Sequence, residues 1–206
     1  MIKVENIEVF NFEGALRGMR NPYDSWDKSD SEFYPWDETS VEIGEKDLDL
    51  MKRLYKGGSE HRKYLRQIFV SLDITAPLYW WKEFDTYKVG TVANSCSTMH
   101  TIHKKKFDAE DFSTEHLNEK SMVTLWVIID ALNTCRQKYI ESKDKDDWWQ
   151  MIQLLPTSYN QKRTVTLNYE NVISIIKQRT GHRLDEWTVL IEEFKTLPYV
   201  KEIMEG

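Results

Sequence analysis

Five residues near the C-terminus carry side chains that bind or polarise small molecules: Asn168, Arg179, His182, Glu186 and Trp187. Asn168 precedes a segment with a helical pattern and Arg179 lies near its end, so both side chains could project toward one neighbouring element. The planar guanidinium of Arg179 offers a fork of donors to a base carbonyl or a phosphate. A helix-capping Asn168 and a surface Arg179 are the alternative interpretation, which spacing alone does not reject.

A second group of polar residues occupies the runs 83–88 and 94–98. It combines a carboxylate, an amide and hydroxyls, namely those of Glu83, Asn94, Ser95, Ser97 and Thr98. Such a mixture can hydrogen-bond a base and a sugar, so we expect a binding loop here. Ordinary polar turn chemistry is the alternative.

A third candidate is the cationic run 61–66, which includes Arg62 and Arg66 and precedes the most regular strand pattern. Its cations are close enough in sequence to meet one phosphate. The alternative is a solvated helix face.

Common catalytic signatures are absent from the sequence, which has no Gly-rich phosphate loop, nucleophile elbow or paired-cysteine zinc pattern. Cys96, His100 and His103 could reach one metal ion from a single loop. Because the sequence offers no fourth ligand, we expect no metal site.

The elements that would position these residues follow from hydrophobic periodicity. Residues 2–10 read as a strand with one irregularity, and residues 21–40 as a long loop. A helix ends at Gly57-Gly58, where glycine supplies a positive φ. Residues 67–75 alternate as a strand, with Ile68, Val70, Leu72 and Ile74 on one face, and residues 78–84 form a short aromatic helix.

The second half of the chain reads mainly as helices after a polar loop at 85–100. A helix begins near Asn118 and carries an apolar stripe that we expect to be core: Met122, Leu125, Trp126, Ile129 and Leu132. Further helices are predicted at 148–155, 169–179 and 185–194.

Composition limits the function classes. A chain of 206 residues, 40% hydrophobic and 30% charged, predicts one globular domain over 1–206. Its net charge of -6 disfavours general nucleic-acid binding but leaves room for a local basic pocket that takes a small phosphorylated ligand. Two cysteines, no apolar membrane span and no signal pattern predict a cytoplasmic protein that does not enter membranes.

The C-terminal residues carry a family resemblance. The spacing of several residues resembles the C-terminal half of flavin-dependent thymidylate synthases. Leu155-Pro156 is followed after eleven residues by Asn168 and after ten more by Arg179, and then by His182 and Glu186-Trp187. The N-terminal half is similar in order, with a strand, Met19-Arg20 where the family has Ala-Arg, a helix ending in glycine, and a strand ending in Ala76-Pro77. The resemblance spans most of the chain, with a variable middle at 104–147.

The signature loop of that family, Arg-His-Arg-x-x-Ser-x-Asn-Glu-x-Ser-x-Arg-Tyr, is similar to residues 86–100. The counterparts are Lys88, Thr91, Asn94 and Ser97, with one residue inserted before Asn94. The leading Arg-His and the closing Arg-Tyr are absent. Glu83 takes the place of a glutamine, Gln67 that of a flavin-side histidine, and Ile152 that of an arginine.

The resemblance implies an α+β fold, with a small curved mixed or antiparallel sheet flanked by helices, in a homotetramer. It implies a flavin (FAD), NADPH and a folate as co-substrates, and one-carbon transfer to dUMP. Arg179 is then the catalytic residue. Substrate would be bound by Glu83, Ser95, Ser97, Thr98 and Arg66, and the cofactor by Lys88, Thr91, Asn94, Asn168 and Gln67.

Two functions stay open. The first is an enzyme that methylates dUMP or a related uracil or cytosine nucleotide; the carboxylate of Glu83 would accept from the exocyclic amine of a cytosine-type base. The second is a nucleotide-binding protein that kept the fold and lost flavin. Arg62, Arg66 and Lys88 could replace the missing loop cations from other backbone positions.

Overall fold

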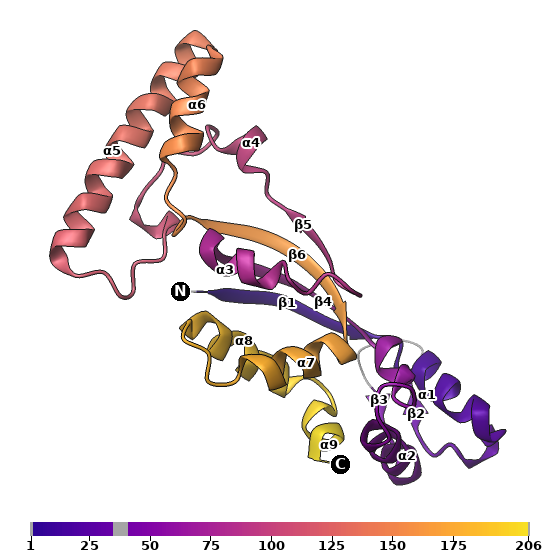
Figure 1. Cartoon of the computed structure of the whole chain (residues 1–206). Helices are drawn as coiled ribbons and strands as arrows, with labels where there is room; N and C mark the ends of the chain where they lie inside the picture. The colour runs from indigo at the N-terminus through magenta and orange to yellow at the C-terminus, as the bar shows by residue number, and fades with distance from the viewer. Residues whose placement is uncertain (1, 35–40, 206) are drawn as a thin grey trace. The chain divides into compact units, whose positions relative to one another are not determined.

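The computed structural model describes residues 2–34 and 41–205 and has a mixed α and β architecture. Four strands form one sheet in the order β1-β4-β6-β5. Their bounds are β1 (Lys3–Phe10), β4 (Phe69–Pro77), β6 (Asn160–Asn168) and β5 (Val92–Ser95) (Figure 1). The α+β class with a small sheet and flanking helices is therefore confirmed.

The strands that neighbour β4 run antiparallel to it. On β1, the Asn6 side chain donates to Asp73 at 2.9 Å, while Phe10 stacks on Phe69 with ring centroids 5.7 Å apart. Residue numbers thus rise on one strand as they fall on the other, and hydrogen bonds along β6 give it the same relation to β4. The predicted alternation is also present, because Ile68, Val70, Leu72 and Ile74 are all buried.

The chain divides into two compact units. The α5 unit consists of Met1–Lys3, Ile74–Thr86 and Asn94–Arg163, and the α7 unit consists of Val4–Asp73, Tyr87–Ala93 and Thr164–Gly206.

In the α7 unit, helices pack in pairs: α7 lies against α8 and α2 against α9, while α1 contacts the short 3-10 helix η3. The elements are α1 (Phe12–Arg20), η1 (Asn21–Tyr23), η2 (Trp26–Lys28), α2 (Glu45–Lys56), η3 (Lys63–Arg66), α7 (Tyr169–Arg179), α8 (Asp185–Thr196) and α9 (Val200–Glu205). Two short strands, β2 (Glu32–Phe33) and β3 (Val41–Glu42), form an antiparallel pair. The core is built from large side chains with almost no exposure, among them Met51, Tyr64, Leu65, Trp187 and Phe194.

The α5 unit contains a helical hairpin. Helix α5 (Glu119–Ser142) turns at Lys143, which has a φ of 57°, and α6 (Lys145–Leu154) returns along it (Figure 1). The hairpin packs on a cluster made of Ile102, Phe107, Phe112, Leu125, Ile129, Leu132 and Met151. The unit also holds α3 (Leu78–Phe84), α4 (Thr98–Thr101) and η4 (Ala109–Asp111).

One predicted core residue is on the surface. Trp126 is 56% exposed, whereas Leu125, Ile129 and Leu132 of the same stripe are buried. Trp126 follows Leu125 by one residue and is therefore turned about 100° away around the helix axis. The expectation that Trp126 is core is wrong.

The structure adds elements that the sequence did not predict. The loop expected at 85–100 contains β5 and α4, and helix α1 and strand β6 lie in stretches left without prediction. Strand β6 has only Val165 and Leu167 as fully buried apolar positions, which is too short an alternation to recognise. Part of the loop predicted at 21–40, residues 35–40, lies outside the described residues. In the described part of the chain, no helix is long and apolar enough to cross a membrane.

Candidate functional site

Arg179 lies at the last position of α7, where aromatic side chains hold its guanidinium. Its Nε donates to the hydroxyl of Tyr87 at 3.0 Å, and its Nη1 lies 3.1 Å from Nε2 of His182. The guanidinium carbon stands 4.6 Å from the ring centroid of Trp187 and 5.5 Å from that of Tyr87. Trp187 on α8 is fully buried, so the arginine rests on a fixed surface. This arrangement presents a planar cation in one orientation.

The segment 87–91 lies along α7 and contacts both of its ends. Near the start of the helix, Asn171 donates from its side-chain amide to the carbonyl of Val89 at 2.9 Å. Near the end of the helix, the hydroxyl of Tyr87 donates to Gln178 at 3.0 Å. Tyr87 lay within the stretch matched to the signature loop but was not among the predicted site residues. No pattern in the sequence connects it with Arg179, 92 positions away.

Tyr87→Phe should lower the free energy of unfolding by about 1 kcal/mol, because it removes a hydroxyl bonded to both Arg179 and Gln178. Tyr55→Phe is the matched control, since the Tyr55 hydroxyl is buried with no hydrogen-bond partner in the described part of the chain. Its loss should leave stability unchanged or raise it. Urea unfolding measures the free energy of unfolding of both variants. Equal losses of stability in Tyr87→Phe and Tyr55→Phe would contradict the role given to the Tyr87 hydroxyl.

Gly90 brings the backbone of this segment close to α7. Its φ is 75°, and a Cβ at this position would lie 2.6 Å from the side-chain nitrogen of Asn168 and 2.9 Å from the side-chain oxygen of Asn171. Only glycine combines that backbone conformation with that approach.

Gly90→Ala should therefore destabilise the protein by about 2 kcal/mol, through the left-handed backbone and the collision together. Gly58→Ala separates the two causes. Gly58 has a φ of 95° with nothing within 4 Å of an added Cβ, so it should show only the backbone cost of about 1 kcal/mol. The two unfolding free energies are compared by denaturant titration, and a Gly90 variant as stable as the Gly58 variant would exclude the collision.

Asn168 caps helix α7. Its side-chain oxygen accepts from the backbone N–H of Asn171 at 3.0 Å, and Asn171 reciprocates toward the N–H of Asn168 at 3.4 Å. Asn168 is only 8% exposed. The capping interpretation of Asn168 is thus confirmed, whereas Arg179 is part-buried and held by other side chains.

Gln67 lies where β4 begins beside the end of β6, because Tyr169 donates from its backbone to the carbonyl of Ile68 at 3.0 Å. The Gln67 carbonyl accepts from Asn11 at 2.8 Å, and its side chain lies against Gly18 of α1. Gln67 and Asn168 therefore stand at neighbouring strand ends.

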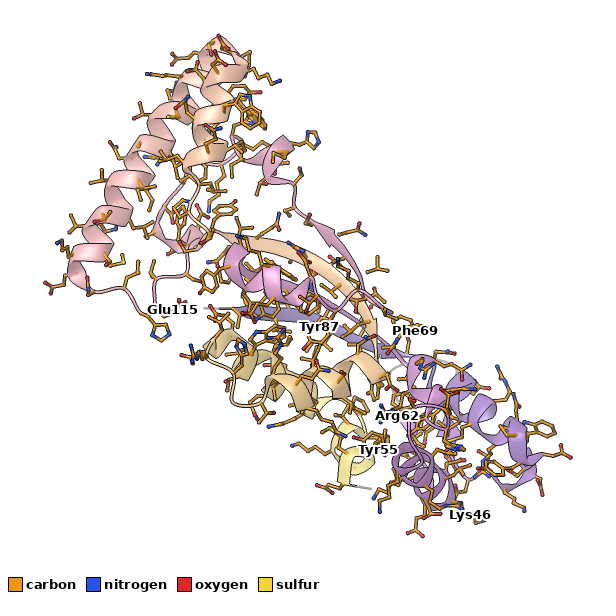
Figure 2. The ribbon with its side chains drawn as sticks, viewed as in Figure 1. Lys46, Tyr55, Arg62, Phe69, Tyr87 and Glu115 are labelled. Atoms are coloured by element: carbon orange, nitrogen blue, oxygen red, sulfur yellow. The ribbon has the colours of Figure 1, made fainter. Side chains whose placement is uncertain are left out.

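The two arginines of the cationic run 61–66 have different partners. Arg62 pairs with Glu170 at 2.8 Å and stands over Tyr55, with 5.7 Å to the ring centroid (Figure 2). Arg66 donates to the carbonyl of Ser59 at 2.9 Å. The two guanidinium groups thus have different partners, and Lys88 is an exposed side chain on another segment.

In the α5 unit, the loop around Ser97 is fixed to β6. Cys96 donates from its backbone to Lys162 at 2.9 Å and accepts from the Gln161 side chain at 2.8 Å. Ser97 caps α4 by accepting from the N–H of His100 at 3.2 Å, and Thr98 is the first residue of that helix. Among the described residues, no group of three metal-ligating side chains was found.

Arg163 organises the surface next to α3 in the same unit. It pairs with Asp85 at 2.8 Å, donates to Gln161 at 3.0 Å, and stands 4.2 Å above the Trp81 ring. Glu83 is a half-buried residue of α3, and its carbonyl accepts from the Thr86 hydroxyl at 2.7 Å. Arg163 and Gln161 were not predicted from the sequence, because they contribute through contacts made only in the folded unit.

The predicted site residues therefore form two groups. The α7 unit carries the catalytic candidate Arg179, the substrate candidate Arg66 and most cofactor candidates: Gln67, Lys88, Thr91 and Asn168. The α5 unit carries the other substrate candidates, Glu83, Ser95, Ser97 and Thr98, and the cofactor candidate Asn94. Within the first group, contacts of the segment 87–91 bring Lys88 and Thr91 to α7, between Asn168 and Arg179.

Known structures share this fold. Thymidylate synthase X from Helicobacter pylori, solved with FAD and dUMP, superimposes with a TM-score of 0.69 over 98% of this chain and 96% of that chain, at 18% identity. A second structure of the flavin-dependent enzyme from Helicobacter pylori, also with FAD and dUMP, gives 0.66 over 96% and 98%, at 18% identity. The UMP/dUMP methylase PolB from Streptomyces cacaoi, bound with 5-Br dUMP, gives 0.68 over 98% and 93%, at 12% identity.

The chain has the fold of the flavin-dependent thymidylate synthases. No protein-family model matches its sequence, and no curated protein matches it either. The likeness therefore lies in the arrangement of helices and strands. The expected fold is confirmed, and a shared fold does not by itself establish an activity.

The α7 unit offers groups that fit a flavin nucleotide. The hydroxyl of Thr91 is buried and has no hydrogen-bond partner in the described residues. Beside it, Gly90 exposes backbone without a side chain, and the exposed Lys88 supplies a cation for a phosphate.

Proposed function

We propose that this chain is an enzyme that transfers a one-carbon unit to a pyrimidine deoxynucleotide, dUMP or a related uracil or cytosine nucleotide. The observation that carries the proposal is the fixed guanidinium of Arg179, held by Tyr87, His182 and Trp187. The fold supports it, because solved proteins of the same fold were bound with dUMP or 5-Br dUMP.

Arg179 would act on the base. Its donors, directed at a pyrimidine carbonyl, stabilise the negative charge that grows on that oxygen when electron density moves through the ring. The surface of Trp187 and the hydroxyl of Tyr87 prevent the guanidinium from rotating, so little reorganisation is needed during reaction. Glu83 would accept a hydrogen bond from the base, and Ser95, Ser97, Thr98 and Arg66 would contact the sugar and phosphate.

FAD is the cofactor of this proposal, with NADPH and a folate as co-substrates. A bound flavin would supply hydride transfer. Lys88 and the Thr91 hydroxyl would hold its polar groups, and Asn94, Asn168 and Gln67 are further proposed contacts of the cofactor. We also propose a homotetramer, in accordance with the family that the sequence resembles.

A visible absorption spectrum tests the cofactor directly. Purified protein is incubated with FAD and desalted, with and without dUMP. A retained flavin band, followed by formation of methylated nucleotide when NADPH and a folate are added, is the expected result. A protein without flavin and without turnover would contradict the enzyme.

The second candidate function is nucleotide binding without redox chemistry. It is favoured by the use of Asn168 as a helix cap and by Lys88 being the sole lysine or arginine in the stretch 86–100. Thermal stabilisation by dUMP or another pyrimidine nucleotide, in a protein that retains no flavin, would select this candidate.

A further inference from the structure

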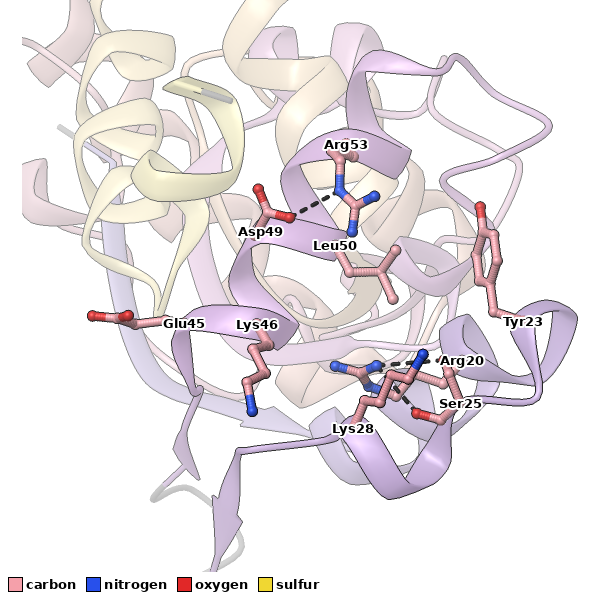
Figure 3. A pocket seen from close by; sticks show the side chains of 9 residues that line it. All are labelled: Arg20, Tyr23, Ser25, Lys28, Glu45, Lys46, Asp49, Leu50 and Arg53. Atoms are coloured by element: carbon pink, nitrogen blue, oxygen red, sulfur yellow. Dashed lines mark hydrogen bonds and ion pairs between the residues drawn. The ribbon is translucent and has the colours of Figure 1, made fainter.

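The α7 unit contains a cavity that lies apart from the residues around Arg179 in the sequence. It has a volume of about 610 Å³ and lies where α1 and the turn after it meet α2. Figure 3 shows Arg20, Ser25 and Lys28 on one side and Lys46, Leu50 and Arg53, from α2, on the other. The volume is within the range of small-molecule pockets, roughly 300 to 1,000 Å³.

Arg20 lines this cavity, and one of its donors has no partner among the described residues. The residue is 4% exposed, its Nε donates to Asp47 at 2.6 Å, and its Nη1 donates to the carbonyl of Ser25 at 3.2 Å. Its Nη2 is buried without a hydrogen-bond partner in the described part of the chain. Buried charged donors are normally hydrogen-bonded, so this nitrogen can still take an acceptor from outside the chain.

Asp47 does not take up the remaining donor. Its second oxygen accepts from the hydroxyls of Ser29 at 2.7 Å and Ser31 at 2.6 Å, and from the N–H of Asp30 at 3.2 Å. Both oxygens of the carboxylate thus have partners of their own.

Positive charge exceeds negative charge around the cavity. Four cations line it, those of Arg20, Lys28, Lys46 and Arg53, against the two lining carboxylates of Glu45 and Asp49 and that of Asp47, which pairs with Arg20. Within the described residues, Lys28 and Lys46 form no ion pair. The Arg53–Asp49 pair, at 2.9 Å, has side chains about two-thirds exposed and is therefore weak. These positive side chains are grouped around one cavity although the whole chain has a net charge of -6.

We propose that this cavity binds the phosphate or diphosphate group of a small phosphorylated ligand. The unpartnered Nη2 of Arg20 would donate to a phosphate oxygen, and Lys28 and Lys46 would neutralise the charge of the phosphate. Tyr23 also lines the cavity, and because it is 56% exposed its ring is accessible to the organic part of the ligand. The site uses none of the residues assigned to the pyrimidine nucleotide.

Titration calorimetry with inorganic pyrophosphate tests the proposal on the full chain. The double variant Lys28→Glu/Lys46→Glu is compared with Lys56→Glu, which changes an exposed lysine of the same α2 helix outside the cavity. We expect wild type and Lys56→Glu to bind alike, and the double variant to bind at least about 30-fold more weakly, because two charge-assisted contacts are lost. Circular dichroism establishes that each variant is folded.

Three results would overturn the proposal: no pyrophosphate binding by the wild type at millimolar concentration, equal weakening in Lys56→Glu, or unchanged binding in the double variant. Arg179→Ala keeps this test separate from the proposed enzyme. It should leave pyrophosphate affinity unchanged, and a loss there would place the anion at the nucleotide site instead.

Discussion

Arg179→Ala will abolish tight binding of a pyrimidine nucleotide while leaving the protein folded. In the proposed function the guanidinium is the strong, oriented donor group directed at the base, and a charge-assisted hydrogen bond contributes about 1.5 to 3 kcal/mol. Affinity for dUMP should therefore fall about 10- to 100-fold. Arg179→Lys should recover little of it, because an ammonium lacks the planar fork that Trp187 and Tyr87 orient.

Lys177→Ala provides the control on the same helix. Lys177 is exposed and stands over Tyr55, with 4.8 Å from its ammonium to the ring centroid, so its removal also deletes one cation and one aromatic contact. Calorimetric titration with dUMP should give wild-type affinity for this variant. If Arg179→Ala binds dUMP as tightly as Lys177→Ala does, both proposed functions fail.

Asp47→Asn should cost about 3 to 5 kcal/mol of stability, the largest structural effect expected of a single substitution here. Asp47 is fully buried and pairs with the equally buried Arg20 at 2.6 Å. The amide would leave the arginine charge inside the protein without compensation. Asp49→Asn on the same helix should cost less than about 0.5 kcal/mol, because its pair with Arg53 is exposed. Urea unfolding of the two variants at neutral pH makes the comparison.

The difference in unfolding free energy between wild type and Asp47→Asn should depend on pH with a defined sign. Burial opposes ionisation of Asp47, but hydrogen bonds from Ser31, Ser29 and Arg20 outweigh it, and the pKa of the carboxyl is lowered. A depressed folded-state pKa contributes stability that is present above the unfolded value, about 3.9, and is lost as pH falls through the folded value. The gap between wild type and Asp47→Asn should thus narrow in acid, and a gap that is constant down to the acid transition would contradict the charge-based explanation.

Local patterns predicted several elements closely. Helices α3 and α7 begin and end where aromatic composition and the Asn168 cap placed them, and Gly58 follows the end of α2 with a positive φ. These signals lie within a few neighbouring residues, so they could be identified without knowledge of the fold. Strand β6 and the exposed face of Trp126 depend on what packs beside them, and the sequence does not contain that information locally.

The candidate site divides in the same way. The interval from Asn168 to Arg179 fixed their places at the two ends of one helix. The partners that orient Arg179 could not be predicted, because Tyr87 comes from a segment 92 residues earlier. The cavity lined by Arg20 was expected only as a general possibility for a local basic pocket, since its cations are contributed by two helices and a turn.

Because segment 87–91 is attached to both ends of α7, the orientation of Arg179 depends on that segment as well as on the helix. A change in the segment can reorient the arginine without any change in the helix that carries it. Conversely, Asn171 and Gln178 can alter the path of the segment from a distance, through single hydrogen bonds. Substitutions at these positions should therefore be interdependent, and an amino acid transplanted at one of them from another protein of the same fold will succeed only together with its partners.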